Sequence, residues 1–307
     1  MRYVRCNDGL GRSAEGNDVR VQDKSRIPFT KMSGSGNDFV VIDHRERRLA
    51  EDDIASFARA VCRRGLGLGA DGVILIELPT RSDVDFRWRY FNADGSVGEM
   101  CGNGAMCGAR FALRHGIAPM SCRFETEAGD IEAVVVDAAN NPAVEIRIAD
   151  AGLPVDAGAL MVEGRTSTFA RLLVGVPHVV TVVDDADAFA DAGCFARWGR
   201  AVRIHESFAP AGVNVNAIHR IDGHTIRMRT YERGVERETL ACGTGAVASA
   251  IVAVANGLVS QPVSVVVSSG QVLVTRFMTT IEGISAICLT GEARFVATGH
   301  LDPEGLV

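Results

Sequence analysis

From residue 28 onward, apolar and polar positions recur with two different spacings. Short apolar or alternating runs, separated by glycine-rich turns, predict strands, whereas spacing of three and four predicts amphipathic helices. In the first half of the chain the predicted strands are FTKM and DFVVID around the turn SGSGN, then GVILIE, VDFRWRYF, SCRFETE, DIEAVVVD and AVEIRIAD. Helices are expected over DDIASFARAVCRR and over GAMCGARFALRHG, which Gly116 closes.

A second series of elements begins near residue 151 and follows a similar order. It contains the predicted strand LLVGVPHVVTVV, the helix DAFADAGCFARWGRAV, the strands VNVNAIHRID and HTIRMRTYE, the hairpin VSVVVSSGQVLVTRF and the strand ICLTGEARFVATG. Residues 1–27 are polar and without periodicity, so we expect a poorly ordered N-terminal extension.

The two series share a repeat. GVILIE followed by VDFRWRYFNADGSVGEMCGNGA resembles NAIHRID followed by HTIRMRTYERGVERETLACGTGA, and both stretches end on a cysteine, a glycine-rich turn and a helix. Repetition at this scale predicts two similar lobes. We expect an N-terminal lobe over 28–150 that carries Cys101 and to which the C-terminal strand, about 290–307, could return. The C-terminal lobe, over 151–289, carries Cys242.

Composition narrows the class of protein. With 307 residues and 47% hydrophobic content, the chain can bury a large core. The net charge of -6 offers no basic surface for nucleic acid or anionic membranes. Neither a membrane-length apolar run nor a secretory signal is seen, so the sequence predicts a cytoplasmic protein.

The cysteine and lysine contents limit the cofactors. Eight cysteines spread through such a chain read as thiols, and none of their spacings is that of a structural zinc site, so no metal is expected. Lysine occurs twice, at Lys24 and Lys31, against thirty arginines. Because pyridoxal phosphate enzymes need a lysine for the Schiff base, this cofactor is not expected either.

The repeated cysteines, Cys101 and Cys242, suggest acid–base chemistry. A thiol at a helix start lies beside unpaired N–H groups and the positive end of the helix dipole, which favour thiolate and predict a lowered pKa. The same N–H groups suit a carboxylate. Facing each other, the two sulfurs could remove the α-proton of an amino acid on one face and return a proton on the other. Taken singly, each buried cysteine could equally be ordinary core packing.

These motifs resemble those of the diaminopimelate epimerases. The resemblance runs from about Phe29 to Leu301 and rests on KMSGSGNDFVVID, GLGADGVILIE, FNADGSVGEMCGNGAMCGARF, GVPH, GVNVNAI and YERGVERETLACGTGA, in that order. It implies an α/β (α+β) fold of two pseudo-symmetric lobes, each a strand-rich, barrel-like unit around a central helix. It further implies a homodimer that acts without cofactor on a small amino-acid substrate in lysine and peptidoglycan precursor synthesis.

The resemblance also assigns site residues. It implies that Cys101 and Cys242 are the acid–base pair. Backbone N–H groups of Gly102, Asn103, Gly243 and Thr244 would bind the carboxylate at the reacting carbon. Asn37 and Glu232 would hold the reacting amino group. Asn92, Asn214 and Arg233 would bind the distal end of the substrate, and His178 would lie beside the thiols.

The chain departs from the family pattern at several positions, and these leave the substrate open. Ser33 and Ser35 replace a common His and Leu, Val176 replaces an Asn before the Pro-His pair, and Gly72 replaces the glutamine of some members. A racemase of another amino acid, such as histidine, is therefore the alternative enzyme. A non-catalytic amino-acid binding protein is a third hypothesis, although binding alone does not need two thiols.

Overall fold

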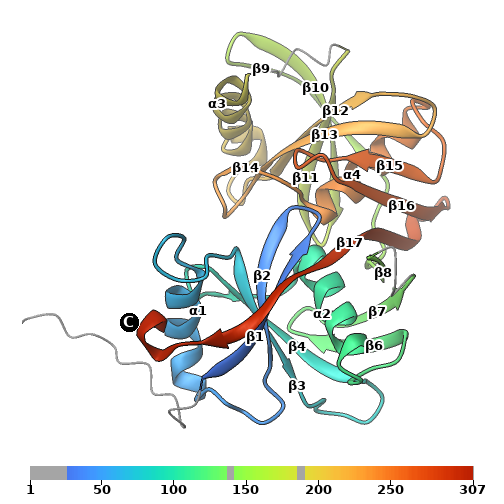
Figure 1. The fold of residues 1–307 in the computed structure, drawn as a ribbon. Helices are drawn as coiled ribbons and strands as arrows, with labels where there is room; N and C mark the ends of the chain where they lie inside the picture. Colours follow the sequence, from blue (N-terminus) through green and yellow to red (C-terminus); the bar gives the residue numbers. More distant parts are fainter. Residues whose placement is uncertain (1–25, 137–141, 185–190, 307) are drawn as a thin grey trace, which may run out of the picture.

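A computed structural model describes residues 26–136, 142–184 and 191–306. The chain forms two lobes, joined by one long strand that runs from the upper lobe into the lower one (Figure 1). Most of the predicted N-terminal extension, part of the turn AANNPA and the beginning of the helix predicted from residue 187 lie outside the described residues. No helix in the described part of the chain is long and apolar enough to cross a membrane.

The elements follow a similar order in the two halves. Those of the first half are β1 (Ile27–Gly34), β2 (Asn37–Asp43), a 3-10 turn (Glu51–Asp53), α1 (Ile54–Cys62), β3 (Gly72–Glu77), β4 (Phe86–Asn92), β5 (Val97–Gly98), α2 (Gly102–Arg114), β6 (Ser121–Thr126), β7 (Gly129–Val135) and β8 (Ala143–Arg147). Those of the second half are β9 (Val155–Val162), β10 (Arg165–Val174), β11 (Val176–Val182), α3 (Ala192–Arg203), a 3-10 turn (Glu206–Phe208), β12 (Asn214–Arg220), β13 (Thr225–Glu232), β14 (Arg237–Thr239), α4 (Gly243–Ala255), β15 (Val263–Val266), β16 (Val272–Thr279), β17 (Ile284–Leu301) and a last 3-10 turn (Pro303–Leu306).

The strands of the lower lobe close into a barrel around α2. Pairing runs from β1 through β2, β3, β4, β6, β7 and β8 to β17, and the end of β17 returns to β1. The interior face of α2 is lined by small residues such as Ala105 and Ala109, which are fully buried. Its polar positions, Arg110 and Arg114, lie beside the ring of Phe295 on β17.

The upper lobe repeats this arrangement around α4, with β10 to β13, β15, β16 and the first half of β17 paired in sequence. The sequence of α4, GTGAVASAIVAVA, is apolar on every side. A helix of this kind is stable in water only when it is surrounded, and residues Gly245 to Ala253 are all buried. Helices α1 and α3 instead pack on the outsides of the two barrels, over separate apolar clusters.

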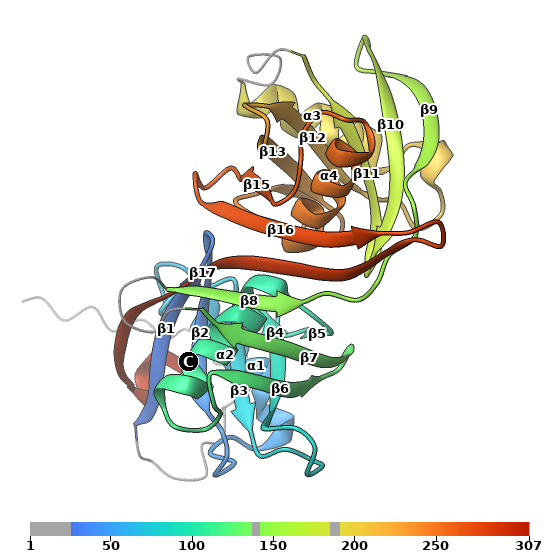
Figure 2. The ribbon, with the colours of Figure 1, turned by 90° about the vertical axis from the view of Figure 1, so that its right-hand side faces the viewer.

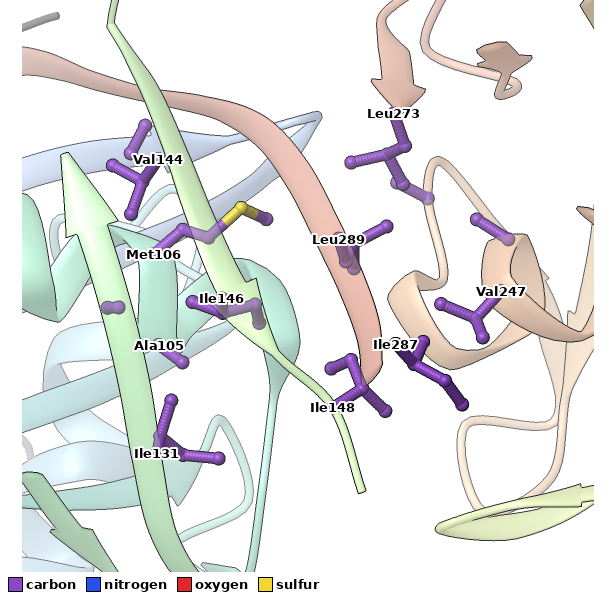
Figure 3. Close-up of a cluster of buried hydrophobic side chains, with 14 of the residues drawn as sticks. Ala105, Met106, Ile131, Val144, Ile146, Ile148, Val247, Leu273, Ile287 and Leu289 are labelled. Carbon is purple, nitrogen blue, oxygen red and sulfur yellow. The ribbon is translucent and has the colours of Figure 1, made fainter. Parts of the chain in front are cut away.

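Strands β8 and β17 lie side by side where the lobes meet (Figure 2). β17 pairs with β8 of the lower lobe on one side and with β16 of the upper lobe on the other. Apolar side chains from both lobes cluster around Leu289 of β17, among them Ile146, Met106, Val247 and Leu273 (Figure 3). The core is therefore continuous across the lobe boundary, which fixes how the starts of α2 and α4 face each other.

Most predicted elements are confirmed, including both helices before residue 120 and the hairpin of β15 and β16. The single strand expected from LLVGVPHVVTVV is wrong. It is a hairpin of β10 and β11, because Gly175 adopts a positive φ of 67° between them. The repeat is also shifted by two residues from the sequence alignment: Val73 pairs with Phe91 and Val215 pairs with Tyr231, so GVILIE corresponds to residues 214–219.

Candidate active site

Cys101 and Cys242 occupy the same position in the two lobes. Each is the N-cap residue of the central helix, with φ −143° and ψ 112° at Cys101 and φ −132° and ψ 113° at Cys242. In both helices the carbonyl of the cysteine accepts the first helical hydrogen bond, at 2.7 Å from Ala105 N and 2.9 Å from Ala246 N. The first-turn N–H groups after each cysteine have no preceding helical carbonyl to bind.

The two helix starts meet. A Cβ built on Gly243 would lie 3.9 Å from Gly102 Cα and 3.1 Å from Leu289 Cδ2. A Cβ on Gly102 would make ordinary contacts with Ile146 and Leu289 at 3.5 and 3.7 Å, so the tighter position is Gly243, where the Leu289 side chain would have to shift. The lobes therefore bring together the residues predicted from the repeat, since Cys101 and Cys242 directly precede the two helix starts and their thiols interact electrostatically.

Both thiols have a raised pKa, contrary to the lowering predicted from their place at helix starts. Burial raises the pKa of Cys101 to about 11, although its sulfur accepts hydrogen bonds from Gly104 N–H and Asn103 N–H, which act in the opposite direction. Burial, with the charge of Glu232 adding to it, also raises the pKa of Cys242. The helix-start effect is present, but removing a thiolate from water costs more.

Cys242 has a proton acceptor beside it. Its thiol makes a hydrogen bond with the Glu232 carboxyl, whose pKa is raised mainly by burial and which also accepts a hydrogen bond from the Thr239 hydroxyl. Thr244 Oγ1 lies 3.6 Å from Cys242 Sγ on the other side. A carboxylate with a raised pKa is a better base than a free one, which makes Glu232 the candidate acceptor for the thiol proton.

His178 is connected to Cys242 by hydrogen bonds through Thr244. The ring is fully buried, and its Nε2 lies 3.1 Å from Thr244 Oγ1. Burial, with the nearby Arg233 cation, lowers the pKa of His178 to about 3, so the ring is neutral. On its other side, Nδ1 lies 3.2 Å from Asn216 Nδ2. Asn216 was missed from the sequence, since it lies on an apolar strand next to Asn214 and its partners come from other strands.

Cys101 is half-buried and has amide neighbours instead. Asn103 Nδ2 donates to Asn37 Oδ1 at 2.7 Å, and Asn37 Nδ2 donates to Asp71 Oδ2 at 3.0 Å. Asp71 also accepts from Arg64 at 3.1 Å, and its charge contributes to the raised pKa values of Cys101 and Glu232. Asp71 is thus a second residue that was missed. It lies in the quoted motif GLGADGVILIE, but the amide that it holds, Asn37, comes from β2.

The residues predicted to bind the distal end occupy strand ends near this space. Asn214 begins β12 and is buried, and its Oδ1 accepts from the backbone N–H of Arg233 at 2.7 Å. The Arg233 side chain contacts Ala211 O at 3.5 Å. Asn92 ends β4 next to Gly72, and its amide donates to Ser96 Oγ at 3.0 Å.

The departures from the family pattern have a local explanation at one position. At Gly72, any Cβ would overlap the ring of Tyr90 and lie 2.5 Å from Phe91 O, so a glutamine cannot fit beside this tyrosine. Ser35 has a φ of 53°, is buried, and presents its carbonyl to Ser269 Oγ of the other lobe at 2.7 Å. That bond uses the backbone of Ser35 and does not explain its side chain. Ser33 is on β1 and Val176 begins β11, and nothing in the structure explains these replacements.

Two cysteines at equivalent helix starts that meet form an arrangement suited to the class of two-base isomerases. The comparisons with known proteins agree with this class. The family model "Diaminopimelate epimerase" matches residues 29–152 and 171–296. The chain therefore belongs to the diaminopimelate epimerase family.

Individual relatives cover nearly the whole chain. The chain is similar to a diaminopimelate epimerase of Aquifex aeolicus, with 44% identity over 91% of this chain and 99% of the relative. It is 43% identical to one of Hydrogenobaculum over 80% of this chain and 89% of the relative. Among solved structures, a PhzF-family phenazine biosynthesis protein of Bacillus anthracis has a TM-score of 0.70 at 14% identity, covering 90% of this chain and 99% of its own. This last likeness concerns the fold alone.

Proposed function

We propose that this protein is a diaminopimelate epimerase that interconverts LL- and meso-diaminopimelate by proton transfer between two thiols and the α-carbon. One observation carries the proposal: Cys101 and Cys242 cap two helices whose starts meet, with a Cβ on Gly243 only 3.9 Å from Gly102 Cα. The family membership of the chain supports the choice of substrate.

The reaction begins with both thiols protonated and the Glu232 carboxylate ionised. Glu232 takes the proton of the Cys242 thiol, and the thiolate removes the α-proton from one face of the substrate. The electron pair of the broken C–H bond moves into the α-carboxylate, whose developing charge the N–H groups of Gly102, Asn103, Gly243 and Thr244 stabilise. The Cys101 thiol then donates its proton to the opposite face and becomes the thiolate. After product release Glu232 loses the proton that it took and Cys101 regains one by exchange with solvent, which restores the starting site. Reversal of these steps converts the other stereoisomer.

Substrate binding makes this sequence easier. The α-ammonium group of a bound amino acid places a positive charge beside Asn37 and Glu232, where it would offset the desolvation that holds both thiols protonated. The distal end of the substrate would contact Asn92, Asn214 and the Arg233 guanidinium, whose fork geometry suits a carboxylate. A substrate with two amino-acid ends uses both sets of residues, which favours diaminopimelate over a shorter amino acid.

We extend the proposal to the organisation of the molecule. The lobes over 28–150, with the end of β17, and over 151–289 are proposed as the two domains, since each surrounds its own central helix. By family resemblance, the protein would act in the cytoplasm as a homodimer, in lysine and peptidoglycan precursor synthesis, without a cofactor.

The test is α-deuterium incorporation in D2O, followed by mass spectrometry under reducing conditions. LL-diaminopimelate is offered beside histidine, glutamate and lysine. Rapid label uptake into diaminopimelate alone is the expected result. Label in another amino acid would keep the two-thiol chemistry but change the substrate, and binding of an amino acid without exchange would revive the binding-protein hypothesis.

A further inference from the structure

Asn216 is a fully buried polar residue behind Cys242, in the middle of strand β12. Each of its polar atoms has a partner. Asn216 Nδ2 lies 3.1 Å from Val179 O and 3.2 Å from His178 Nδ1, and Oδ1 accepts a hydrogen bond from Thr230 Oγ1 at 2.9 Å. A buried amide with all its groups satisfied is held in one orientation, because a flip would leave several of them unpaired.

This orientation decides where His178 carries its proton. A backbone carbonyl can only accept hydrogen bonds, so the group facing Val179 O is the NH2 of Asn216. The same NH2 group donates to His178 Nδ1, which must therefore be unprotonated. In a neutral imidazole the proton is then on Nε2, the nitrogen that lies 3.1 Å from Thr244 Oγ1.

The proton on Nε2 in turn orients the Thr244 hydroxyl. Oγ1 accepts from His178, so the single hydroxyl hydrogen is available to Cys242 Sγ at 3.6 Å. We propose that Asn216 is a positioning residue, which commits His178 to its Nε2–H tautomer and the Thr244 hydroxyl to donation toward the Cys242 sulfur. This inference rests on the proposed two-thiol epimerisation, where a hydroxyl donating to sulfur stabilises the thiolate that removes the α-proton.

The charges around this chain of hydrogen bonds agree with a neutral ring. Arg233 lies close enough to His178 to oppose its protonation, and burial acts in the same direction. Around Cys242 the ionisable neighbours are Glu232 and Cys101. Because the histidine does not change charge over the working pH range, its tautomer is the property that Asn216 controls.

The lower lobe provides an internal comparison. By strand register, Phe39, Ile74 and Tyr90 occupy the places of His178, Asn216 and Thr230. A Cβ on Gly104 would contact Ile74 at 3.4 Å, and one on Gly245 would lie 2.6 Å from Asn216 Oδ1, which shows that the two positions are equivalent. The same fold thus packs an apolar group behind Cys101, so the barrel itself does not require an asparagine here.

The first experiment determines the tautomer directly. Protein labelled with [15N]histidine is studied by NMR at pH 7.5 without substrate, and the His178 signals are assigned by their loss in a His178→Gln variant. We expect a neutral ring with the proton on Nε2. A ring with the proton on Nδ1, or protonated on both nitrogens, would overturn the proposal.

The second experiment measures the consequence for catalysis. Asn216→Leu keeps the approximate size of the side chain but removes the donor to Nδ1. We expect a mixture of the two tautomers and a kcat for diaminopimelate lowered roughly 5- to 10-fold, the rate equivalent of about one hydrogen bond, with KM within about twofold of wild type. The matched control is Thr230→Val, which removes the bond to Asn216 Oδ1 and leaves both Nδ2 contacts in place. It should retain the Nε2–H ring and a kcat within about twofold. Wild-type kcat in a folded Asn216→Leu protein would contradict the inference.

A further pair of variants covers the case in which Asn216→Leu does not fold. Thr244→Val removes the hydroxyl and should lower kcat by about tenfold or more, whereas Thr244→Ser keeps it and should stay within about threefold. Equal kcat in the two variants would overturn the proposed hydrogen bond from the Thr244 hydroxyl to Cys242 Sγ. If wild type shows the Nε2–H ring but exchanges no α-proton of diaminopimelate, the proposed function fails while the assigned tautomer stands.

Discussion

The surroundings of Cys101 and Cys242 differ although the two backbones are alike. Both residues cap the central helix of a barrel in the same extended conformation. Behind Cys242 the barrel wall carries His178, Asn216 and Thr230, whereas the lower lobe has Phe39, Ile74 and Tyr90 at the matching places. The repeat preserves the geometry that presents a thiol, and the side chains behind it are free to differ.

The polar residues near the two helix starts differ between the lobes as well. Glu232 ends β13 beside Cys242, and the matching position at the end of β4 is Asn92, an amide that cannot take a proton. Asn103, which matches Thr244, connects to Asn37 and Asp71. In the proposed mechanism the upper lobe therefore provides the proton acceptor, and the lower lobe provides amides and a carboxylate that suit an ammonium group.

The largest effect is expected from removing either thiol. Cys101→Ala and Cys242→Ala should each lower epimerisation by about a thousandfold or more, because each turnover needs both sulfurs whatever surrounds them. Cys107→Ala is the matched control, since it removes a buried cysteine from the same helix as Cys101 without touching the reacting space. α-Proton exchange and circular dichroism measure activity and folding. Wild-type turnover of Cys101→Ala would rule out the two-thiol mechanism.

Substitutions of Glu232 and Asn92 are predicted to change different kinetic constants, kcat for Glu232 and KM for Asn92. Glu232→Gln removes the base and should lower kcat by about a hundredfold. Since the pKa of Glu232 is raised, wild-type kcat/KM should fall as pH drops through a value above that of an ordinary glutamate, and this limb should be absent from the variant. Asn92→Ala should instead raise KM about tenfold with kcat little changed. Steady-state kinetics from pH 5 to 9 separate the two, and matching effects on kcat would argue against the division of roles.

Alkylation of the ligand-free enzyme compares the sulfurs themselves. Because the thiolate reacts and burial raises the pKa of Cys101 to about 11, its modification by iodoacetamide should be slow at pH 7 and accelerate about tenfold per pH unit toward that value. Cys242 should react later than Cys101, since it is 7% exposed and Cys101 is half-buried. Peptide mass spectrometry follows both sites, and fast labelling of either at pH 7 would mean that a thiolate already exists in the empty site.

The smallest effect on activity is expected from removing the Asp71 carboxylate. Asp71→Asn keeps the shape of the side chain but permits Asn37 to flip and removes a negative charge near the reacting carbon, so KM should rise about tenfold. Arg64→Gln is the control, because it breaks the ion pairs to Asp38 and Asp71 but leaves the Asn37 contact. Its KM should stay within about twofold, as an exposed ion pair contributes little. Equal effects in the two variants would mean that Asp71 acts only through the ion-pair network.

Local sequence was sufficient to predict the strands around residues 29–43 and 72–91 and the helices that follow each cysteine. Their periodicity, glycine turns and caps act over a few residues. It failed at Gly175, where an apolar run concealed a hairpin, because a positive φ at one glycine reverses the chain without altering the hydrophobic pattern. It also failed on the thiol pKa, which depends on how deeply the two lobes bury each sulfur.

By itself the sequence determined the two repeated lobes, the paired cysteines and the family, since these follow from motifs written in order along the chain. Tertiary structure alone decided which strand completes which barrel, that burial outweighs the hydrogen bonds to both thiols, and that Asn216 contacts His178 and Asp71 contacts Asn37. The physical reason is distance along the chain: Asn216 acts on His178 38 residues away, and Asp71 holds Asn37 34 residues away. Contacts between residues so far apart in the chain leave no local pattern in the sequence, and they form only when the strands pair.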